Sequence, residues 1–262
     1  MKIRQIRSAC SVVAYAGKDF LVDPWLAPKD AKPAFPFAAY QKRRQPRADL
    51  PCSIDELTQV DAVYVSHLHP DHFDATAKER LPKHLKMFAQ SEADAGELRS
   101  YGFQDVEVLK ETGTRFGDIM LYKTSGEHGR FDAADTMLRK LNISGRLEVS
   151  GIVFKHPHEK TLYICGDTVW CPAVKAAIDT HQPDVIIVFS AAAEFLEGGN
   201  IIMGKTDVYN VFNAAPKATI IATHMDNVSH AMITRAELKA FLEDNDMTSR
   251  VLVPDDGQAY TF

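Results

Sequence analysis

Short apolar runs recur along the chain and are separated by segments with amphipathic spacing. The runs are rich in β-branched residues, which is typical of strands covered on one or both faces. They predict strands at residues 2–7, 11–15, 20–22, 62–65, 87–89, 107–109, 119–124, 151–155, 161–165, 185–189, 219–222 and 251–254. The amphipathic segments predict helices at residues 75–80, 92–101, 172–180, 206–214 and 235–244.

The last predicted helix has a clear start signal. Thr234 precedes it and Glu237 follows three positions later, which is the spacing of a capping box. Strands come first along the chain, strand and helix then alternate, and this order recurs in the second half. We therefore predict an α/β fold in which two mixed sheets pack together with helices outside. A chain of 262 residues is compatible with one domain, which we expect over residues 1–262.

Composition places the chain among soluble globular proteins, because 45% of residues are hydrophobic and 25% are charged. The net charge of −5 weighs against nucleic-acid binding, which usually requires a basic surface. No apolar run near the N-terminus is long enough for a signal peptide or a membrane span. The four cysteines form no CxxC pair and are too few for a disulfide scaffold. We expect reduced thiols and a cytoplasmic location.

Polar residues that can carry chemistry follow the predicted strands. The strongest signal is the segment His67-Leu68-His69-Pro70-Asp71-His72, which comes directly after a buried strand. Three imidazoles and a carboxylate this close together are costly to bury unless a cation satisfies them. Imidazole nitrogens and carboxylate oxygens suit zinc, and they also suit manganese or iron. The alternative, a solvated histidine-rich turn, is disfavoured by the apolar strand that anchors the segment.

Other candidate ligands stand at later strand ends. His128 lies between glycines after the strand at 119–124, Asp167 follows the strand at 161–165, and His224 follows the strand at 219–222. Alone, each has an ordinary explanation: a surface histidine, a turn residue and a core histidine. Because loops at strand ends build the sites of α/β proteins, the three together with residues 67–72 predict one metal site.

The ordered set of Asp23, the HxHxDH segment, His128, Asp167 and His224 resembles the five motifs of the metallo-β-lactamase-fold superfamily. The flanking residues Gly166-Asp167-Thr168 and Ala222-Thr223-His224-Met225 resemble most the branch that contains ascorbate-6-phosphate lactonase. That branch often carries a Gly-His pair in the first hairpin, where this chain has Ser8-Ala9-Cys10.

The resemblance implies a four-layer αββα sandwich with the site along one edge and two divalent ions, Zn²⁺ or else Mn²⁺ or iron. It implies that His67, His69 and His128 bind one ion. It further implies that Asp71, His72 and His224 bind the other. Asp167 would bridge both ions, and Asp23 would orient the ligand imidazoles from behind.

The implied activity is hydrolysis of a small ester, lactone or phosphorylated metabolite by water that two metal ions activate. Asp71 is the candidate for orienting this water and handling its proton. Three alternatives stay open: a phosphodiesterase acting on nucleotides or RNA, a di-iron redox protein, and a metal-binding protein without catalysis. The expected partner is a small-molecule substrate rather than nucleic acid or a membrane, and a homo-oligomer is compatible with the sequence.

Residues outside the metal set also attract attention. His230, shortly after His224, is either a substrate-binding or proton-donating residue or a surface histidine. Trp170 either walls the pocket or packs against the sheet. Residues 130–146 form either a lid over the site or a peripheral helix. The proline-rich stretch 27–51 is predicted to be a long loop, and long ordered loops in compact domains are often functional.

Overall fold

Two seven-stranded sheets form the centre of the structure, a computed structural model that describes residues 1–36, 38–129, 148–195 and 199–262. The first sheet has the order β16-β1-β2-β3-β4-β5-β6. Its strands are β1 (Lys2–Arg7), β2 (Cys10–Tyr15), β3 (Lys18–Val22), β4 (Ala62–Val65), β5 (Lys86–Ala89), β6 (Asp105–Val108) and β16 (Ala259–Thr261).

The second sheet has the order β15-β14-β11-β10-β9-β8-β7. Its strands are β7 (Thr114–Phe116), β8 (Ile119–Ser125), β9 (Ser150–Lys155), β10 (Leu162–Ile164), β11 (Val185–Phe189), β14 (Thr219–Thr223) and β15 (Val251–Leu252). A small hairpin of β12 (Glu194–Phe195) and β13 (Gly199–Asn200) stands apart from both sheets.

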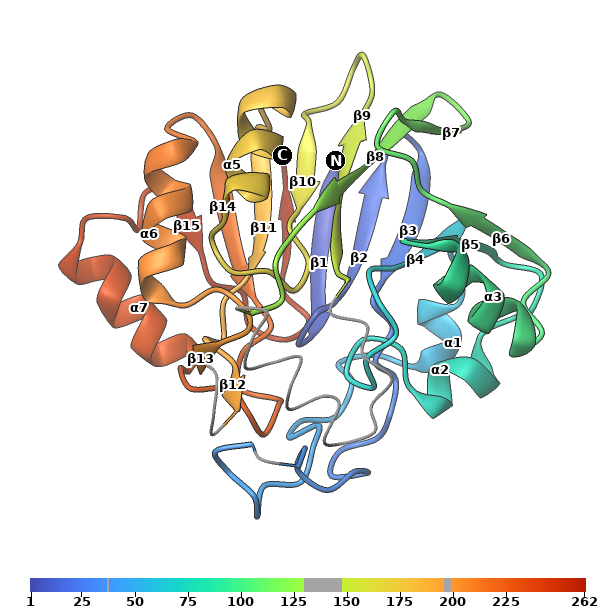
Figure 1. Cartoon of the computed structure of the whole chain (residues 1–262), viewed down its shortest axis with the longest axis horizontal. Coiled ribbons are helices and arrows are strands. Elements are labelled where there is room, and N and C mark those ends of the chain that lie inside the picture. The colour runs from blue at the N-terminus through green and yellow to red at the C-terminus, as the bar shows by residue number, and fades with distance from the viewer. Residues whose placement is uncertain (37, 130–147, 196–198) are drawn as a thin grey trace.

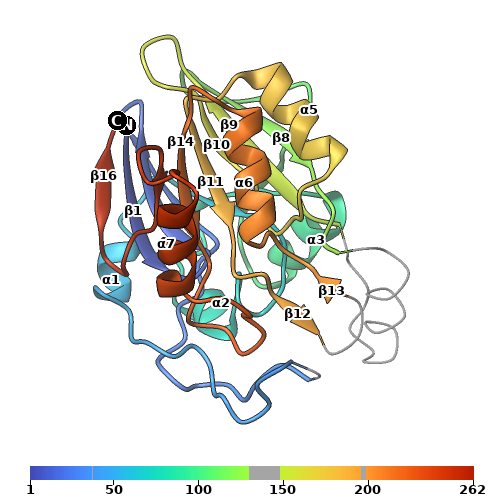
Figure 2. The ribbon, with the colours of Figure 1, turned by 90° about the vertical axis from the view of Figure 1, so that its left-hand side faces the viewer.

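Helices lie on the outer sides of the two sheets (Figures 1 and 2). In the part of the chain that the structure describes they are α1 (Ile54–Leu57), α2 (Ala75–Arg80), α3 (Glu92–Ser100), α5 (Pro172–His181), α6 (Lys205–Ala214) and α7 (Arg235–Asp244). Helix α3 contacts β5 and β6, whereas α5 contacts β8. This arrangement confirms the predicted sandwich of two mixed sheets with helices outside.

Alternation along the central strands explains why the first sheet is buried on both faces. Phe20 and Tyr64 belong to the large apolar cluster that includes strands of the second sheet. Leu21 and Val63 point to the opposite face and join a second cluster, which includes residues of α2 and α3. Because side chains alternate with a period of two, apolar residues at successive positions let one strand serve both cores.

The direction of the strands decides where the site can form. β3, β4 and β5 are parallel to one another, and so are β10, β11 and β14. β8 pairs antiparallel with β9, which pairs antiparallel with β10, so β8 runs in the same direction as β10. Within each sheet, these carboxyl ends therefore meet at one edge.

Most predicted elements are present, with ends shifted by one or two residues. The prediction was wrong in omitting α1, β7, β12, β13 and β16, which are all short. The sequence of β16, Ala259-Tyr260-Thr261, has no buried residue and is held by backbone pairing with β1. The predicted strand at 251–254 ends at Leu252, two residues before a proline that cannot donate to a ladder.

The capping box predicted at the start of α7 is confirmed. The Glu237 N–H donates to Thr234 Oγ1 at 3.2 Å, and the Thr234 N–H donates to Glu237 Oε2 at 2.8 Å. We expect Thr234→Ala to lower the free energy of unfolding by about 1 kcal/mol, since one backbone N–H loses its partner. Chemical denaturation measures this loss. Thr248→Ala, in an exposed turn, is the matched control, and an equal loss in both variants would contradict the capping role.

Candidate metal centre

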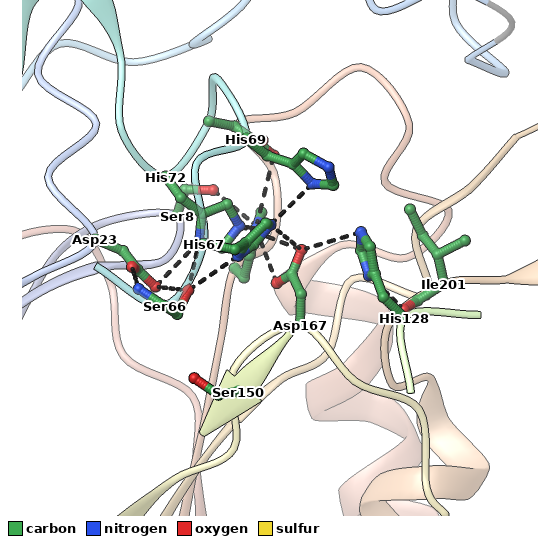
Figure 3. Close-up of polar contacts among 12 residues, drawn as sticks. Ser8, Asp23, Ser66, His67, His69, His72, His128, Ser150, Asp167 and Ile201 are labelled. Carbon is green, nitrogen blue, oxygen red and sulfur yellow. Dashed lines mark hydrogen bonds and ion pairs between the residues drawn. The ribbon is translucent and has the colours of Figure 1, made fainter. Parts of the chain in front are cut away.

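The predicted site residues converge between the ends of strands from both sheets (Figure 3). β4 leads into residues 66–72, β10 leads into Gly166-Asp167, and His224 directly follows β14. His128 comes three residues after β8 ends. All seven predicted ligands belong to groups whose donor atoms lie within 4.8 Å of one another. The sequence therefore predicted correctly which side chains come together.

Asp167 is the centre of this cluster. Its Oδ2 lies 3.2 Å from His72 Nε2, 3.8 Å from His67 Nε2 and 3.9 Å from His128 Nε2. Its Oδ1 lies 3.6 Å from His224 Nε2. One buried carboxylate thus faces imidazoles that come from three separate parts of the chain.

Gly166 fixes the position of this carboxylate. Its φ of +74° is in the left-handed region, and a Cβ there would lie 2.5 Å from the Ser150 carbonyl oxygen. Any other residue at this position would push the turn away from Ser150. The close approach of two backbone segments therefore requires glycine immediately before Asp167.

The cluster contains two sets of potential ligands, which a third group of His67, His72 and Asp167 connects. His67, His69 and His128 form one set, in which His67 Nε2 lies 2.8 Å from His69 Nδ1. Asp71, His72 and His224 form the other set. In it, His224 Nε2 lies 3.1 Å from His72 Nε2 and 3.8 Å from Asp71 Oδ2.

Burial keeps most of these imidazoles neutral. It disfavours the charged form of His67, His69 and His224 and lowers the pKa of each. For His128, burial lowers the pKa to about 4. A neutral imidazole keeps one nitrogen lone pair free, which is the form that binds a metal ion.

The two carboxyls are held in their charged form, whereas most of the imidazoles are neutral. Burial opposes the ionisation of Asp71 and Asp167, but the neighbouring His72 and His224 outweigh it and hold the pKa of both carboxyls below the ordinary value. Burial also disfavours the imidazolium of His72, but Asp167 and Asp23 outweigh it and raise the pKa of His72 well above its ordinary value. The site therefore combines ionised carboxylates with imidazole donors.

These residues fit a divalent metal centre. Asp167 Oδ1 is buried and accepts no hydrogen bond among the described residues, although a buried carboxylate oxygen normally has a partner. His67 Nε2 faces His69 Nδ1, and His224 Nε2 faces His72 Nε2. Two nitrogen lone pairs at such distances repel each other unless a proton or a cation lies between them. Histidine and carboxylate donors at this spacing suit zinc, manganese or iron.

A second layer of hydrogen bonds orients the ligand imidazoles. Asp23 is fully buried; its Oδ1 accepts from the Ser66 N–H at 2.7 Å, and its Oδ2 accepts from Ser66 Oγ at 2.8 Å and from His72 Nδ1 at 3.0 Å. Since the Ser66 hydroxyl donates to Asp23, its oxygen is left to accept from His67 Nδ1 at 3.0 Å. Asp23 and Ser66 thus orient the rings of the predicted ligands His72 and His67.

Three groups that support the imidazoles were not predicted from the sequence. Ser66 Oγ is one, and its position directly before His67 was the available signal. Ser8 Oγ lies 2.9 Å from His224 Nδ1. The Ile201 carbonyl accepts from His128 Nδ1 at 2.9 Å, and a backbone carbonyl leaves no mark in a sequence.

His230 is buried beside the cluster rather than exposed on the surface. Its ring packs edge-on against Phe35 with 5.0 Å between centroids. Burial lowers the pKa of His230 to about 4, although the charge of Asp71 opposes this shift. The surface alternative for this residue was wrong, and its position is compatible with contact to a substrate.

Trp170 and the segment 130–146 are the remaining candidates for a wall or a lid of the site. Trp170 is half-buried against the core and lines a cavity together with Glu127, Asn200 and Asp207. None of the predicted metal ligands is among the described residues that line this cavity. The segment 130–146, predicted as a lid or a peripheral helix, lies outside the described residues.

The two facing sheets and the histidine- and aspartate-rich cluster at their edge define a metallo-hydrolase of the α/β sandwich class. The family model of the beta-lactamase superfamily domain matches residues 18–225, so the chain belongs to the β-lactamase superfamily. In the described residues, no helix is both long and apolar enough to cross a membrane.

Relatives match over the whole chain. The UPF0173 protein YddR of Bacillus subtilis (strain 168) is 49% identical over 263 residues, with 100% of each chain covered. The crystal structure of an isothiocyanate hydrolase from Delia radicum gut bacteria is 39% identical with a TM-score of 0.94, covering 100% of this chain and 99% of that one. A possible metal-dependent hydrolase from Veillonella parvula DSM 2008 is 37% identical with a TM-score of 0.95, over 100% and 99%.

These similarities confirm the predicted metallo-β-lactamase fold and the class of metal-dependent hydrolase. The narrower resemblance to the ascorbate-6-phosphate lactonase branch stays a prediction.

Proposed function

We propose that the chain hydrolyses a small electrophilic substrate at a centre of two divalent metal ions, and that isothiocyanates are the substrate class to test first. The observation that carries the hydrolytic centre is the pair of ligand sets around Asp167. The choice of isothiocyanates rests on the hydrolase of that name, which is 39% identical over the whole chain. The burial of the cluster favours a small molecule over a polymer.

His67, His69 and His128 would hold one ion, and Asp71, His72 and His224 would hold the other. Asp167, which has imidazoles of both sets within 4 Å of its two oxygens, would bridge them. Such a pair of ions lowers the pKa of water to near neutrality and polarises the electrophile.

The protein residues would contribute position and proton transfer. Asp71, at 4% exposure, accepts the proton of the attacking water. His230, buried against Phe35, would hold the substrate by a hydrogen bond. The overall reaction is R–N=C=S + H₂O → R–NH₂ + O=C=S, in which the water oxygen bonds to the central carbon, the C–N bond breaks and both protons end on nitrogen.

The test is elemental analysis of the purified protein combined with a substrate panel of benzyl isothiocyanate, a lactone, a carboxylic ester and a phosphodiester. We expect two divalent ions per chain and release of benzylamine. Faster turnover of the lactone or the ester would reassign the substrate class and keep the centre. A protein that purifies without metal and stays active would overturn the proposal.

Removing the metal should abolish turnover and lower the thermal stability. A chelator would leave Asp167 and its imidazoles buried without a cation, and any ion that binds only the folded chain adds to its stability. We expect a loss of activity of more than about a hundredfold and a lower Tm, both reversed by adding zinc or manganese. Calorimetry and a rate assay on the dialysed protein measure this. Full activity after complete removal would contradict a metal mechanism.

A further inference from the structure

The long loop that follows β3 is anchored beside the metal centre. Arg7 is fully buried, and its guanidinium donates to the carbonyl oxygens of Trp25 at 2.7 Å, Ala27 at 2.8 Å and Ala48 at 2.8 Å. One side chain thus ties together the two ends of the loop. Because these carbonyls belong to the residues at the two ends of the loop, the hydrogen bonds fix where the segment 28–47 begins and ends.

The same loop is bonded to the segment that carries His230. The Phe35 N–H donates to Ser229 Oγ at 3.0 Å, and the Ser229 N–H donates to Gln45 Oε1 at 3.0 Å. Gln45 in turn pairs with Lys32 through two backbone hydrogen bonds of 2.9 Å. Nearby, the Ala48 N–H donates to Asn227 Oδ1 at 3.0 Å. The loop 28–48 and the segment 226–230 therefore form one bonded wall.

Phe35 is the aromatic residue that this wall holds at the site. Its ring lies edge-on to the buried ring of His230 at an interplanar angle of 79°. Phe35 itself is only half-buried, so the residue keeps exposed surface beside the buried His230. His230 follows the predicted ligand His224 by six residues, and both side chains are buried, so the Phe35–His230 pair lies on the segment that leaves this end of the cluster.

We propose that Phe35 is a specificity-determining residue, which binds an aromatic or bulky apolar substituent of the substrate beside His230. The inference deepens the proposed function and rests on its substrate being a small electrophile with such a substituent. A rigid aromatic ring loses little conformational freedom when it packs against another ring. Ring pairs prefer the offset or edge-on arrangements that a partly exposed phenyl group permits.

The experiment compares compounds that carry a large or a small substituent. Each is tested on the wild type, on Phe35→Ala, on Phe35→Leu and on a control variant. The control is Tyr40→Ala, which removes an aromatic ring from the same loop; this ring packs on the Arg43 guanidinium. Turnover is measured with benzyl and methyl isothiocyanate. Binding is measured separately by calorimetry with benzyl mercaptan and ethanethiol, because thiols bind zinc-type centres through sulfur whatever the true substrate is.

We expect Phe35→Ala to lower kcat/KM for benzyl isothiocyanate about tenfold, mainly through KM, and to leave the methyl compound within about twofold. The preference for benzyl mercaptan over ethanethiol should fall by a similar factor. Phe35→Leu should keep part of both preferences. Tyr40→Ala should keep both preferences in full, and metal content should match the wild type in every variant.

Two failures can be told apart. In the first case the wild type does not hydrolyse isothiocyanates, but it prefers benzyl mercaptan and the Phe35→Ala variant does not. The substrate class is then wrong, and the role of Phe35 stands. If Phe35→Ala changes large and small compounds equally, or if the wild type has no preference in the thiol assay, the role of Phe35 is overturned.

Discussion

Replacing Asp167 by alanine should lower kcat/KM roughly a thousandfold, because several kcal/mol of transition-state stabilisation depend on a metal pair. Asp167 lies within 4 Å of imidazoles from both ligand sets. Its loss removes the carboxylate that the two sets share. The metal content should fall from the proposed two ions per chain to one or fewer, which elemental analysis after dialysis measures.

The variant Asp167→Asn sharpens this result. Asparagine keeps the shape of the side chain and one oxygen, but it removes the negative charge that His72 and His224 face. We expect it to retain more metal than Asp167→Ala and to remain well below the wild type in turnover. Two ions per chain in both variants would contradict the bridging role of Asp167. A circular dichroism spectrum like that of the wild type would show that the fold is intact.

The residues that converge in the candidate centre were predictable from the sequence because each predicted strand marks both a buried segment and the polar residue at its end. The apolar residues of β4, β10 and β14 reveal buried strands, and the polar residue that follows each strand stands out against them. β4 belongs to one sheet and β10 and β14 to the other. Parallel strands bring the ends to one edge within each sheet, and the site lies where these two edges meet. The pattern indicated the order of the predicted ligands along the chain, and the packing of the two sheets explains why such distant residues meet.

The supporting groups were less accessible for a physical reason. His224 has a φ of +64°, a conformation rare for residues other than glycine. Its N–H donates to the Ser8 carbonyl at 3.1 Å and its ring meets Ser8 Oγ. Nothing in the residues around Ser8 indicates a contact with a residue more than two hundred positions later. Such contacts follow from how the two sheets pack, and the same is true of Phe35 and His230.

The short helices and strands were also hard to predict from the sequence. β16 has no apolar alternation and exists because β1 offers an unpaired edge. α1 is a single turn that begins where Ser53 Oγ accepts from the Glu56 N–H at 3.1 Å. Periodicity reveals elements that bury a face, and it overlooks elements held by one edge or one cap.

Replacing Asp23 by asparagine should weaken metal binding about 10- to 100-fold, the usual effect of losing a partner behind a ligand. Asp23 Oδ2 accepts from both Ser66 Oγ and His72 Nδ1. An amide group turned to keep the Ser66 N–H bond through its oxygen would present N–H groups to these two donors. His72 would then lose its fixed orientation toward Asp167 and His224. Competition with a chromogenic chelator measures the affinity.

Asp74→Asn is the matched control for this variant. Asp74 is also a buried aspartate, but it is the N-cap of α2, and its Oδ1 accepts from the N–H groups of Leu26 and Ala77. It therefore caps α2 and supports the loop, and its contacts do not include a predicted ligand. We expect Asp74→Asn to lower the free energy of unfolding and to leave the metal affinity within about twofold of the wild type. This change in affinity is much smaller than the one expected for Asp23→Asn. Equal losses of metal affinity in the two variants would mean that Asp23 acts through general stability, whereas a loss confined to Asp23→Asn would assign it the orientation of His72.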